Sequence, residues 1–215
     1  MKKDHEKYIL FYKFLKACIA PLAINIFVKK INKLKINNYP KTFIVASNHT
    51  SFLDPLILSS IFIVKFNRKI YYIGKKELFR TLPSKIFHEA VGTIRLDSKD
   101  KGKSALRIAE KYLRNGQIVG IFPEGRRSPN GKLQRAFTGV AKLALKAKVP
   151  VLPVAIEGTF ELMPIGRVIP KFKRKVIINV GNLMYFNKYY KKGINKRVLR
   201  EITNEIMINI RNLKR

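Results

Sequence analysis

Two loops that follow apolar, strand-like runs carry the residues that could do chemistry. In the first loop, His49 and Asp54 lie five positions apart. A carboxylate beside an imidazole can fix the tautomer of the ring and stabilise the imidazolium that forms when the ring accepts a proton. His49 could then act as a general base toward a hydroxyl group, and such a base typically contributes about 10²- to 10⁴-fold in rate. A regular helix would turn two side chains at this spacing away from each other, so the pairing requires a bend between them.

Structural roles remain open for the same two residues. Asp54 followed by Pro55 suits the first positions of a helix, where the carboxylate would cap the free backbone N–H groups. A histidine in a polar turn can simply be hydrogen-bonded there. Because one carboxylate oxygen could cap while the other meets His49, the structural and catalytic roles are compatible.

The second loop is Phe122-Pro123-Glu124-Gly125-Arg126-Arg127-Ser128, which follows the apolar run Ile118–Ile121. Gly125 permits tight backbone geometry, and arginine is suited to bidentate binding of a phosphate group. The alternative is a charged surface turn in a basic protein. The segment therefore indicates an anion site or an exposed turn.

These two segments resemble conserved motifs of a known enzyme family. Asn48-His49-Thr50-Ser51-Phe52-Leu53-Asp54 and the Phe122–Ser128 segment resemble the first and third motifs of the glycerophospholipid acyltransferase family, which includes the lysophosphatidate acyltransferases. Val149–Ile156 resembles the fourth motif, and Val91-Gly92-Thr93-Ile94 resembles part of the second. The four motifs occur in the family's order and cover about residues 40–160.

The resemblance implies transfer of a fatty acyl group from a thioester to the free hydroxyl of 1-acyl-glycerol 3-phosphate, which gives phosphatidic acid in phospholipid biosynthesis. It implies that His49 deprotonates the hydroxyl, that Asp54 orients His49, and that no acyl-enzyme intermediate forms. No cofactor or metal is expected, and acyl-CoA or acyl-carrier protein is the donor substrate. The residues implied in binding are Glu124, Gly125 and Arg127 for the acceptor, with Arg127 on its phosphate, and Pro153 in the wall of the acyl-donor site.

The sequence departs from the family's pattern at two places. The second motif commonly has an arginine after its aspartate, whereas this chain has Asp97-Ser98 and an earlier Arg95. Arg95 could supply the phosphate contact, although strand alternation would point it away from the side that position 98 faces. Position 126 is often threonine in the family and is Arg126 here, where an extra cation could bind phosphate or lie in solvent.

Short β-branched and aromatic runs alternate with helical patterns along the rest of the chain, which predicts an α/β fold with a mixed, mostly parallel sheet flanked by helices. Functional loops are then expected at the carboxyl ends of the strands. The predicted strands are Thr42–Ala46, Ile70–Ile73, Thr93–Leu96, Ile118–Phe122, Val151–Ile156 and Val176–Val180. The predicted helices are Pro55–Val64, Ser104–Arg114, Arg135–Lys148 and Lys196–Leu213.

The first 38 residues differ from the acyltransferase-like part, which we assign to residues 39–215. The uncharged run Ala17–Val28 has 12 residues, fewer than the ~20 that a membrane-spanning helix needs. We expect an amphipathic helical segment lying in the membrane interface, and the alternative is a helix packed on the protein's own core. Cys18, the only cysteine, excludes an intrachain disulfide, and its apolar surroundings predict a buried side chain.

A net charge of +32 indicates an anionic partner. An anionic membrane surface, a lysophosphatidate-like acceptor and an acidic acyl-carrier protein all suit this charge, which predicts a peripheral or monotopic protein at the cytoplasmic face of the cell membrane. Other acceptors, such as glycerol 3-phosphate or lyso-ornithine lipid, remain open within the same chemistry. A basic nucleic-acid-binding protein is the alternative from another class, but no motif for nucleic acid supports it. A catalytically silent lipid-binding protein is a further alternative.

Overall fold

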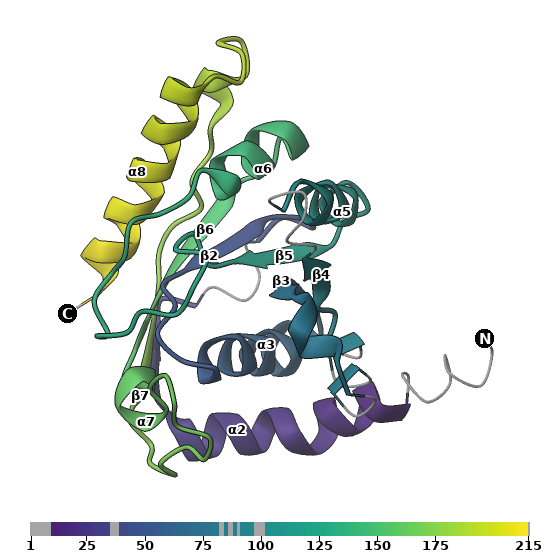
Figure 1. Ribbon diagram of the computed structural model, residues 1–215, viewed down its shortest axis with the longest axis vertical. Helices are drawn as coiled ribbons and strands as arrows, with labels where there is room; N and C mark the ends of the chain where they lie inside the picture. The colour runs from purple at the N-terminus through teal and green to yellow at the C-terminus, as the bar shows by residue number, and fades with distance from the viewer. Residues whose placement is uncertain are drawn as a thin grey trace.

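The computed structural model describes residues 10–34, 39–81, 84–85, 88–89, 91–96 and 102–214. A seven-stranded sheet with the order β1-β7-β6-β2-β5-β3-β4 lies at its centre (Figure 1). Five adjacent strands from β6 to β4 are parallel, β7 is antiparallel to β6, and β1 is parallel to β7. The strands are β1 (Val28–Asn32), β2 (Ile44–Ser47), β3 (Ile70–Lys75), β4 (Ile94–Leu96), β5 (Ile118–Ile121), β6 (Val151–Glu157) and β7 (Val176–Val180). The predicted mixed, mostly parallel sheet is confirmed.

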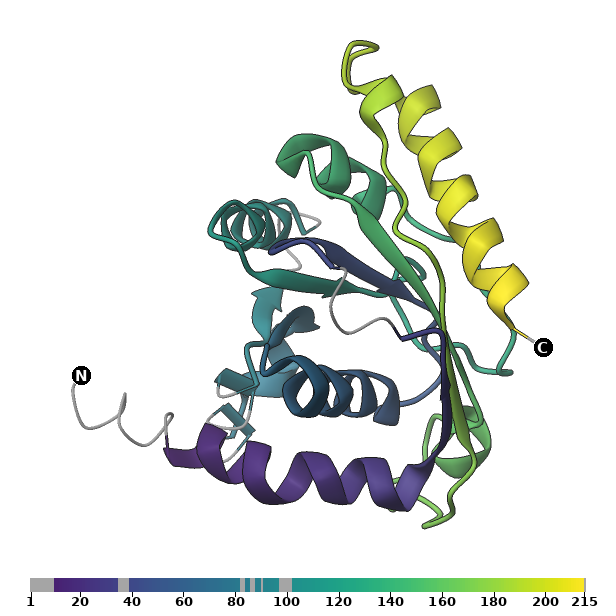
Figure 2. The same ribbon diagram turned by 180° about the vertical axis from the view of Figure 1, so that it is seen from behind.

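Helices cover both faces of the sheet. Figures 1 and 2 show α2 (Ala20–Phe27) and α3 (Leu53–Phe66) on one side, and α5 (Lys103–Arg114), α6 (Gly139–Ala147) and α8 (Lys196–Leu213) on the other. The shorter helical elements are the π-helical turn η1 (Leu15–Ile19), the 3-10 turns η2 (Lys76–Phe79) and η4 (Asn187–Tyr189), and the one-turn helix α7 (Thr159–Leu162).

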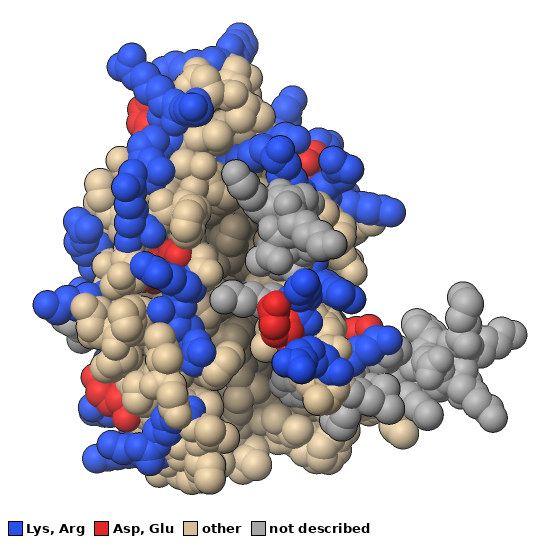
Figure 3. Space-filling view, in the orientation of Figure 1, with Lys and Arg blue, Asp and Glu red and all other residues tan. Residues whose placement is uncertain are grey.

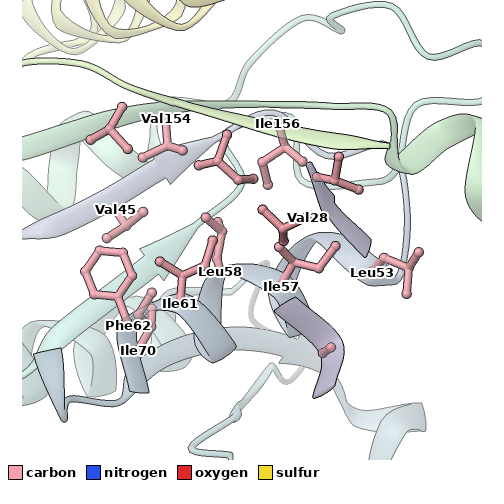
Figure 4. Close-up of a cluster of buried hydrophobic side chains, with 14 of the residues drawn as sticks. Val28, Val45, Leu53, Ile57, Leu58, Ile61, Phe62, Ile70, Val154 and Ile156 are labelled. Atoms are coloured by element: carbon pink, nitrogen blue, oxygen red, sulfur yellow. The ribbon is translucent and has the colours of Figure 1, made fainter. Parts of the chain in front are cut away.

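Helix α3 is apolar on nearly every side because it lies between the sheet and α2. Its Ile57, Ile61 and Phe62 are buried in one cluster with Val45 and Val154 of the sheet (Figure 4). A helix that is hydrophobic all round is typical of such a fully covered position. The packing of α3 fixes the direction in which the chain leaves β2.

Strand β2 is buried on both faces, as expected for a central strand of a parallel sheet. Val45 faces the α3 side, whereas Ile44 and Ala46 belong to the cluster beneath α5, α6 and α8. This alternation follows from the two-residue period of a strand. The residues that directly follow β2 therefore begin from a rigid position.

The six predicted strands and four predicted helices are all present, with one notable difference in limits. The helix predicted from Arg135 begins at Gly139. The preceding residues are not helical because N–H groups in this segment bond elsewhere: Gln134 donates to Glu124 and Phe137 donates to the carbonyl of Pro123. These bonds attach the 133–138 segment to the Phe122–Ser128 loop.

The N-terminal segment is helical from Leu10 to Phe27, with a mean hydropathy of 1.5. Its π-helical turn ends at Ile19, two residues before Pro21, whose missing N–H cannot close a regular helical bond. Cys18 is exposed, contrary to the prediction, because it lies on the side of the helix that faces away from the protein.

The predicted helical character of residues 1–38 is wrong for Val28–Asn32. These residues form β1, an edge strand paired with β7, and the N–H of Lys175 continues this contact at the carbonyl of Phe27. Residues 28–32 therefore belong to the sheet rather than to a separate helical segment. Residues 1–9 and 35–38, together with Asp97 and Ser98, lie outside the described residues.

Candidate active site

The turn between β2 and α3 brings His49 and Asp54 together. His49 Nδ1 lies 2.9 Å from Asp54 Oδ2. The Asp54 side chain is fully buried, whereas the His49 side chain is 16% exposed. The bend that the pairing requires is present, because α3 begins at Leu53 after a non-helical turn.

Asp54 is surrounded by hydrogen-bond donors. Its Oδ2 accepts from the backbone N–H groups of Thr50 (2.6 Å) and Ser51 (2.8 Å) as well as facing His49. Its Oδ1 accepts from the Thr159 hydroxyl at 2.6 Å. The residue that precedes the helix is Phe52, so Asp54 is not the N-cap but holds the turn before the helix. These bonds fix the carboxylate in one orientation toward the imidazole.

The plane of the His49 ring is set by an aromatic stack. The ring centroid of His49 lies 4.0 Å from that of Phe122, with an interplanar angle of 16°. Phe122 in turn stacks on the buried Tyr72 at 5.5 Å and 10°. Because Nδ1 donates to the carboxylate, Nε2 is the ring nitrogen that can accept a proton. This geometry would allow His49 to act as a general base through Nε2.

Glu124 holds the backbone of His49. Its side chain is buried, Oε1 accepts from the N–H of His49 at 2.8 Å, and Oε2 accepts from the N–H of Gln134 at 2.7 Å. The N–H of Ser128 donates to the His49 carbonyl at 2.7 Å. Burial raises the pKa of Glu124, and the two backbone hydrogen bonds oppose that shift. Residues of the Phe122–Ser128 loop thus hydrogen-bond both the N–H and the carbonyl of His49.

Gly125 makes the tight turn that these hydrogen bonds to His49 require. Its φ is +67°, a left-handed conformation that favours glycine, and its N–H donates to the Phe122 carbonyl at 2.9 Å. A Cβ at this position would lie 3.0 Å from the Phe137 ring. The glycine lets the chain reverse between the apolar strand and the arginines that follow.

Arg127 is half-buried and lies against the β2–α3 turn. Its guanidinium carbon lies 3.5 Å from the ring centroid of Phe52, which belongs to the β2–α3 turn. Burial lowers the pKa of Arg127, and the negative charge of Asp54 opposes this shift. A planar cation held against the turn that carries His49 and Asp54 can bind an anionic group there.

The acyltransferase sequence model matches residues 28–157, which is more than half of the 215-residue chain. This chain belongs to the acyltransferase family. The chain is also similar in structure to the 1-acyl-sn-glycerophosphate acyltransferase PlsC from Thermotoga maritima, which is known from a crystal structure. The TM-score is 0.70 at 25% identity, covering 94% of this chain and 80% of the other.

Two sequence relatives are proteins named as acyltransferases. The 1-acyl-sn-glycerol-3-phosphate acyltransferase of Bacillus subtilis is 32% identical over 117 residues, which is 54% of this chain and 56% of the relative. The probable 1-acyl-sn-glycerol-3-phosphate acyltransferase of Mycoplasma genitalium is 28% identical over 169 residues, which is 76% of this chain and 63% of the relative. The chain thus spans less than two thirds of the length of these two relatives.

Three predicted site residues of this acyltransferase-family chain are not brought beside His49. Arg126 is exposed in the Phe122–Ser128 loop. Arg95 is exposed on the edge strand β4, which is separated from β2 by β5 and β3. Pro153 is buried within β6 opposite Ala46, and its carbonyl accepts from the N–H of Gly181 at 2.9 Å. These three residues could contact a substrate bound at His49 only if that substrate extended as far as their positions.

Two residues whose contacts the sequence analysis missed fasten the site to β6. The Asn48 amide bonds both the N–H and the carbonyl of Ile156 at 2.8 Å, which extends the β2–β6 ladder beyond Ser47. Thr159 follows Gly158, whose φ is +90°. Its hydroxyl lies 3.0 Å from the Thr50 hydroxyl in addition to bonding Asp54. The sequence feature that could have indicated this contact is a glycine and a threonine directly after a buried strand.

Replacing Thr159 with valine is expected to lower kcat about tenfold, equivalent to ~1.4 kcal/mol. The variant leaves Oδ1 of a buried carboxylate without its donor, which loosens the orientation of Asp54 and His49. Thr159 would position Asp54 rather than contact substrate, so the KM values for donor and acceptor should change little. Thr159→Ser keeps the hydroxyl and should restore kcat. Steady-state kinetics of both variants measure this, and a serine variant as impaired as the valine variant would contradict the role.

Proposed function

We propose that this protein is a 1-acylglycerol-3-phosphate O-acyltransferase that converts 1-acyl-glycerol 3-phosphate to phosphatidic acid in phospholipid biosynthesis. The observation that carries the proposal is the His49–Asp54 pair at the carboxyl end of β2, with Arg127 beside it. The names of the relatives support the choice of acceptor. The donor is a fatty acyl thioester of coenzyme A or of an acyl-carrier protein, and no cofactor takes part.

Transfer proceeds in one displacement without an acyl-enzyme. His49 Nε2 takes the proton from the acceptor hydroxyl while the hydroxyl oxygen forms a bond to the thioester carbonyl carbon. Asp54 stabilises the imidazolium through Nδ1. The carbon–sulfur bond then breaks, and the thiolate that leaves receives the proton from His49. The products are the ester and a free thiol, and the base is regenerated.

Arg127 binds the phosphate of the acceptor in this proposal. Replacing it with glutamine is expected to lower kcat/KM for lysophosphatidate about 10- to 100-fold, because a hydrogen bond to a charged group contributes ~1.5–3 kcal/mol. Turnover of a phosphate-free acceptor such as monoacylglycerol should change little. Parallel assays of the two acceptors measure this. The matched control is Arg126→Gln at the exposed neighbouring position, which should lower kcat/KM less than threefold if Arg126 lies in solvent.

The same pair of assays tests the choice of acceptor. A wild-type preference for a phosphate-free acceptor, such as lyso-ornithine lipid, would remove the role of Arg127 and redirect the proposal to another lysolipid. Preference for glycerol 3-phosphate would keep the phosphate contact but change the acceptor. Equal losses for Arg126→Gln and Arg127→Gln would indicate that general positive charge, rather than a specific contact, attracts the acceptor.

We place the protein at the cytoplasmic face of the cell membrane as a peripheral or monotopic enzyme. The Leu10–Phe27 helix supports this location: it is apolar, and only 22% of it is buried. Part of the helix packs on α3, which favours attachment along the surface over passage through the bilayer. The charge of +32 supports attraction to anionic lipid head groups and to an acidic acyl-carrier protein.

A further inference from the structure

The segment between α7 and β7, residues 163–175, combines exposed apolar side chains with a concentration of positive charge. We call it the apolar–basic loop. Its exposed large apolar side chains are Ile165 (47%), Val168 (85%), Ile169 (67%) and Phe172 (71%). Its basic residues are Arg167, Lys171, Lys173, Arg174 and Lys175. Clustered exposure of this kind marks an interaction surface rather than the scattered apolar residues of an ordinary protein surface.

The apolar–basic loop is held in place by contacts with the end of α2. Phe172 stacks on Phe27 with ring centroids 6.0 Å apart and an interplanar angle of 23°. Lys175 N–H donates to the Phe27 carbonyl at 3.0 Å, and Arg174 Nε donates to the Val28 carbonyl at 2.7 Å. The loop therefore presents its apolar side chains from a fixed backbone, next to the N-terminal helix.

That helix also exposes apolar side chains. Leu10, Phe14 and Leu22 are 70%, 51% and 57% exposed, and Lys13 and Lys16 are exposed among them. In Figure 3 the lower edge of the molecule, where α2 lies in Figure 1, is largely free of Lys and Arg, whereas Lys and Arg together with acidic residues are seen at the lower left, where α7 lies in Figure 1. The helix and the apolar–basic loop thus form a continuous surface with an apolar part and a basic part.

We propose that the apolar–basic loop is a second membrane-contacting element that acts together with the N-terminal helix. Val168, Ile169 and Phe172 enter the boundary between head groups and acyl chains of an anionic bilayer, and the basic side chains contact lipid phosphates. An acidic protein or a nucleic acid would match the cations but leave the apolar side chains exposed. A second copy of this chain would bring like charges together.

This contact would place the bilayer next to the catalytic pair. The loop begins at Met163, whose carbonyl accepts from the Ser51 hydroxyl at 2.8 Å, and α7 directly before it carries Thr159, which bonds Asp54. A lysolipid could therefore approach His49 while its acyl chain stays in the membrane. This functional consequence rests on the proposed acyltransferase activity, whereas the membrane contact itself does not.

Vesicle binding tests the contact directly. The purified full chain is mixed with phosphatidylcholine vesicles that contain or lack phosphatidylglycerol, and the bound fraction is measured by flotation. The triple variant Val168→Ser/Ile169→Ser/Phe172→Ser should bind the anionic vesicles at least about tenfold more weakly than wild type, because three apolar side chains no longer enter the bilayer. The matched control Ile108→Ser/Ile194→Ser/Ile208→Ser removes three exposed apolar side chains from other surfaces and should bind like wild type.

A tryptophan reporter gives a second, independent readout, because the chain contains no tryptophan. Val168→Trp should show a blue shift of its emission on anionic vesicles and quenching by brominated acyl chains. Ile194→Trp should show neither. Ile194 is 48% exposed in the basic turn before α8, and this turn lies at the opposite end of the long axis from α7 (Figure 1). Unchanged emission of Val168→Trp, or wild-type binding of the loop triple variant, would overturn the proposal.

Membrane contact and catalysis can fail separately in these experiments. His49→Ala should bind vesicles like wild type. Loss of binding in the loop variant would support the second contact even if the wild type makes no phosphatidic acid, and that outcome would refute the proposed reaction alone. Normal vesicle binding by the loop variant of an active enzyme would refute the second contact alone.

Discussion

His49→Ala is expected to lower kcat for acyl transfer by about 10²- to 10⁴-fold, the contribution typical of a positioned general base. The variant removes the ring nitrogen that takes the proton of the acceptor hydroxyl. It keeps the backbone N–H and carbonyl of residue 49, which bond Glu124 and Ser128, so the fold should stay intact. Steady-state kinetics in mixed micelles and thermal unfolding of the same samples measure the two effects.

His88→Ala is the matched control for this loss. His88 lies outside the β2–α3 turn. Its Nδ1 is 3.1 Å from the Thr93 hydroxyl. If His49 alone supplies general-base catalysis, the loss of kcat in His88→Ala should be about 100-fold smaller than the loss in His49→Ala. Substantial turnover by His49→Ala with both substrates saturating would exclude His49 as the base.

Asp54→Asn is expected to cause the second large loss, also about 10²- to 10⁴-fold in kcat. The carboxylate faces donors on both of its oxygens, so the NH₂ group of asparagine must point at Thr159 or toward the N–H groups of the turn and His49. In the first orientation the Thr159 hydroxyl can accept instead of donate, whereas the second sets a donor against donors, and both remove the negative charge that stabilises the imidazolium. The free energy of unfolding should fall by ~1–3 kcal/mol, since a buried hydrogen bond is lost. Kinetics and urea denaturation measure both effects.

Ser51→Ala separates catalysis from stability in that experiment. Its hydroxyl bonds the carbonyl of Met163 and the N–H of Leu53 but does not touch the Asp54 carboxylate. The alanine variant should lose a similar ~1–3 kcal/mol of unfolding free energy while its kcat stays within a few-fold of wild type. If Ser51→Ala lost as much kcat as Asp54→Asn, the effect of Asp54 would be one of stability rather than of orientation.

Much of the fold could be predicted because local patterns and tertiary structure agree. Val176–Val180 and Lys196–Leu213 have the limits that were predicted, since the first is a short β-branched run and the second places its apolar residues on one helical face. The strand Val28–Asn32 was missed because two of its five residues are lysines and its partner β7 is distant in sequence. Edge strands of this kind are specified by pairing more than by their own composition.

The candidate site was predictable where it depends on residue type and spacing, as for His49 and Asp54. Glu124 has a structural contact that was not predicted, because each of its oxygens accepts a backbone N–H group. That bonding depends on the register between β2 and β5, which no local pattern reveals. Thr159 reaches Asp54 only because β6 lies next to β2 on the other side. Contacts across neighbouring strands are therefore the part that required the structure.

The most direct test of the central claim is the formation of phosphatidic acid by the purified protein. Lysophosphatidate in mixed micelles is incubated with labelled acyl-CoA or acyl-carrier protein, and phosphatidic acid and free thiol are quantified together by mass spectrometry and thiol titration. The proposed reaction predicts phosphatidic acid with at least one donor and an equal amount of thiol. Absence of phosphatidic acid with both donors, from protein that is folded and binds the micelles, would contradict it.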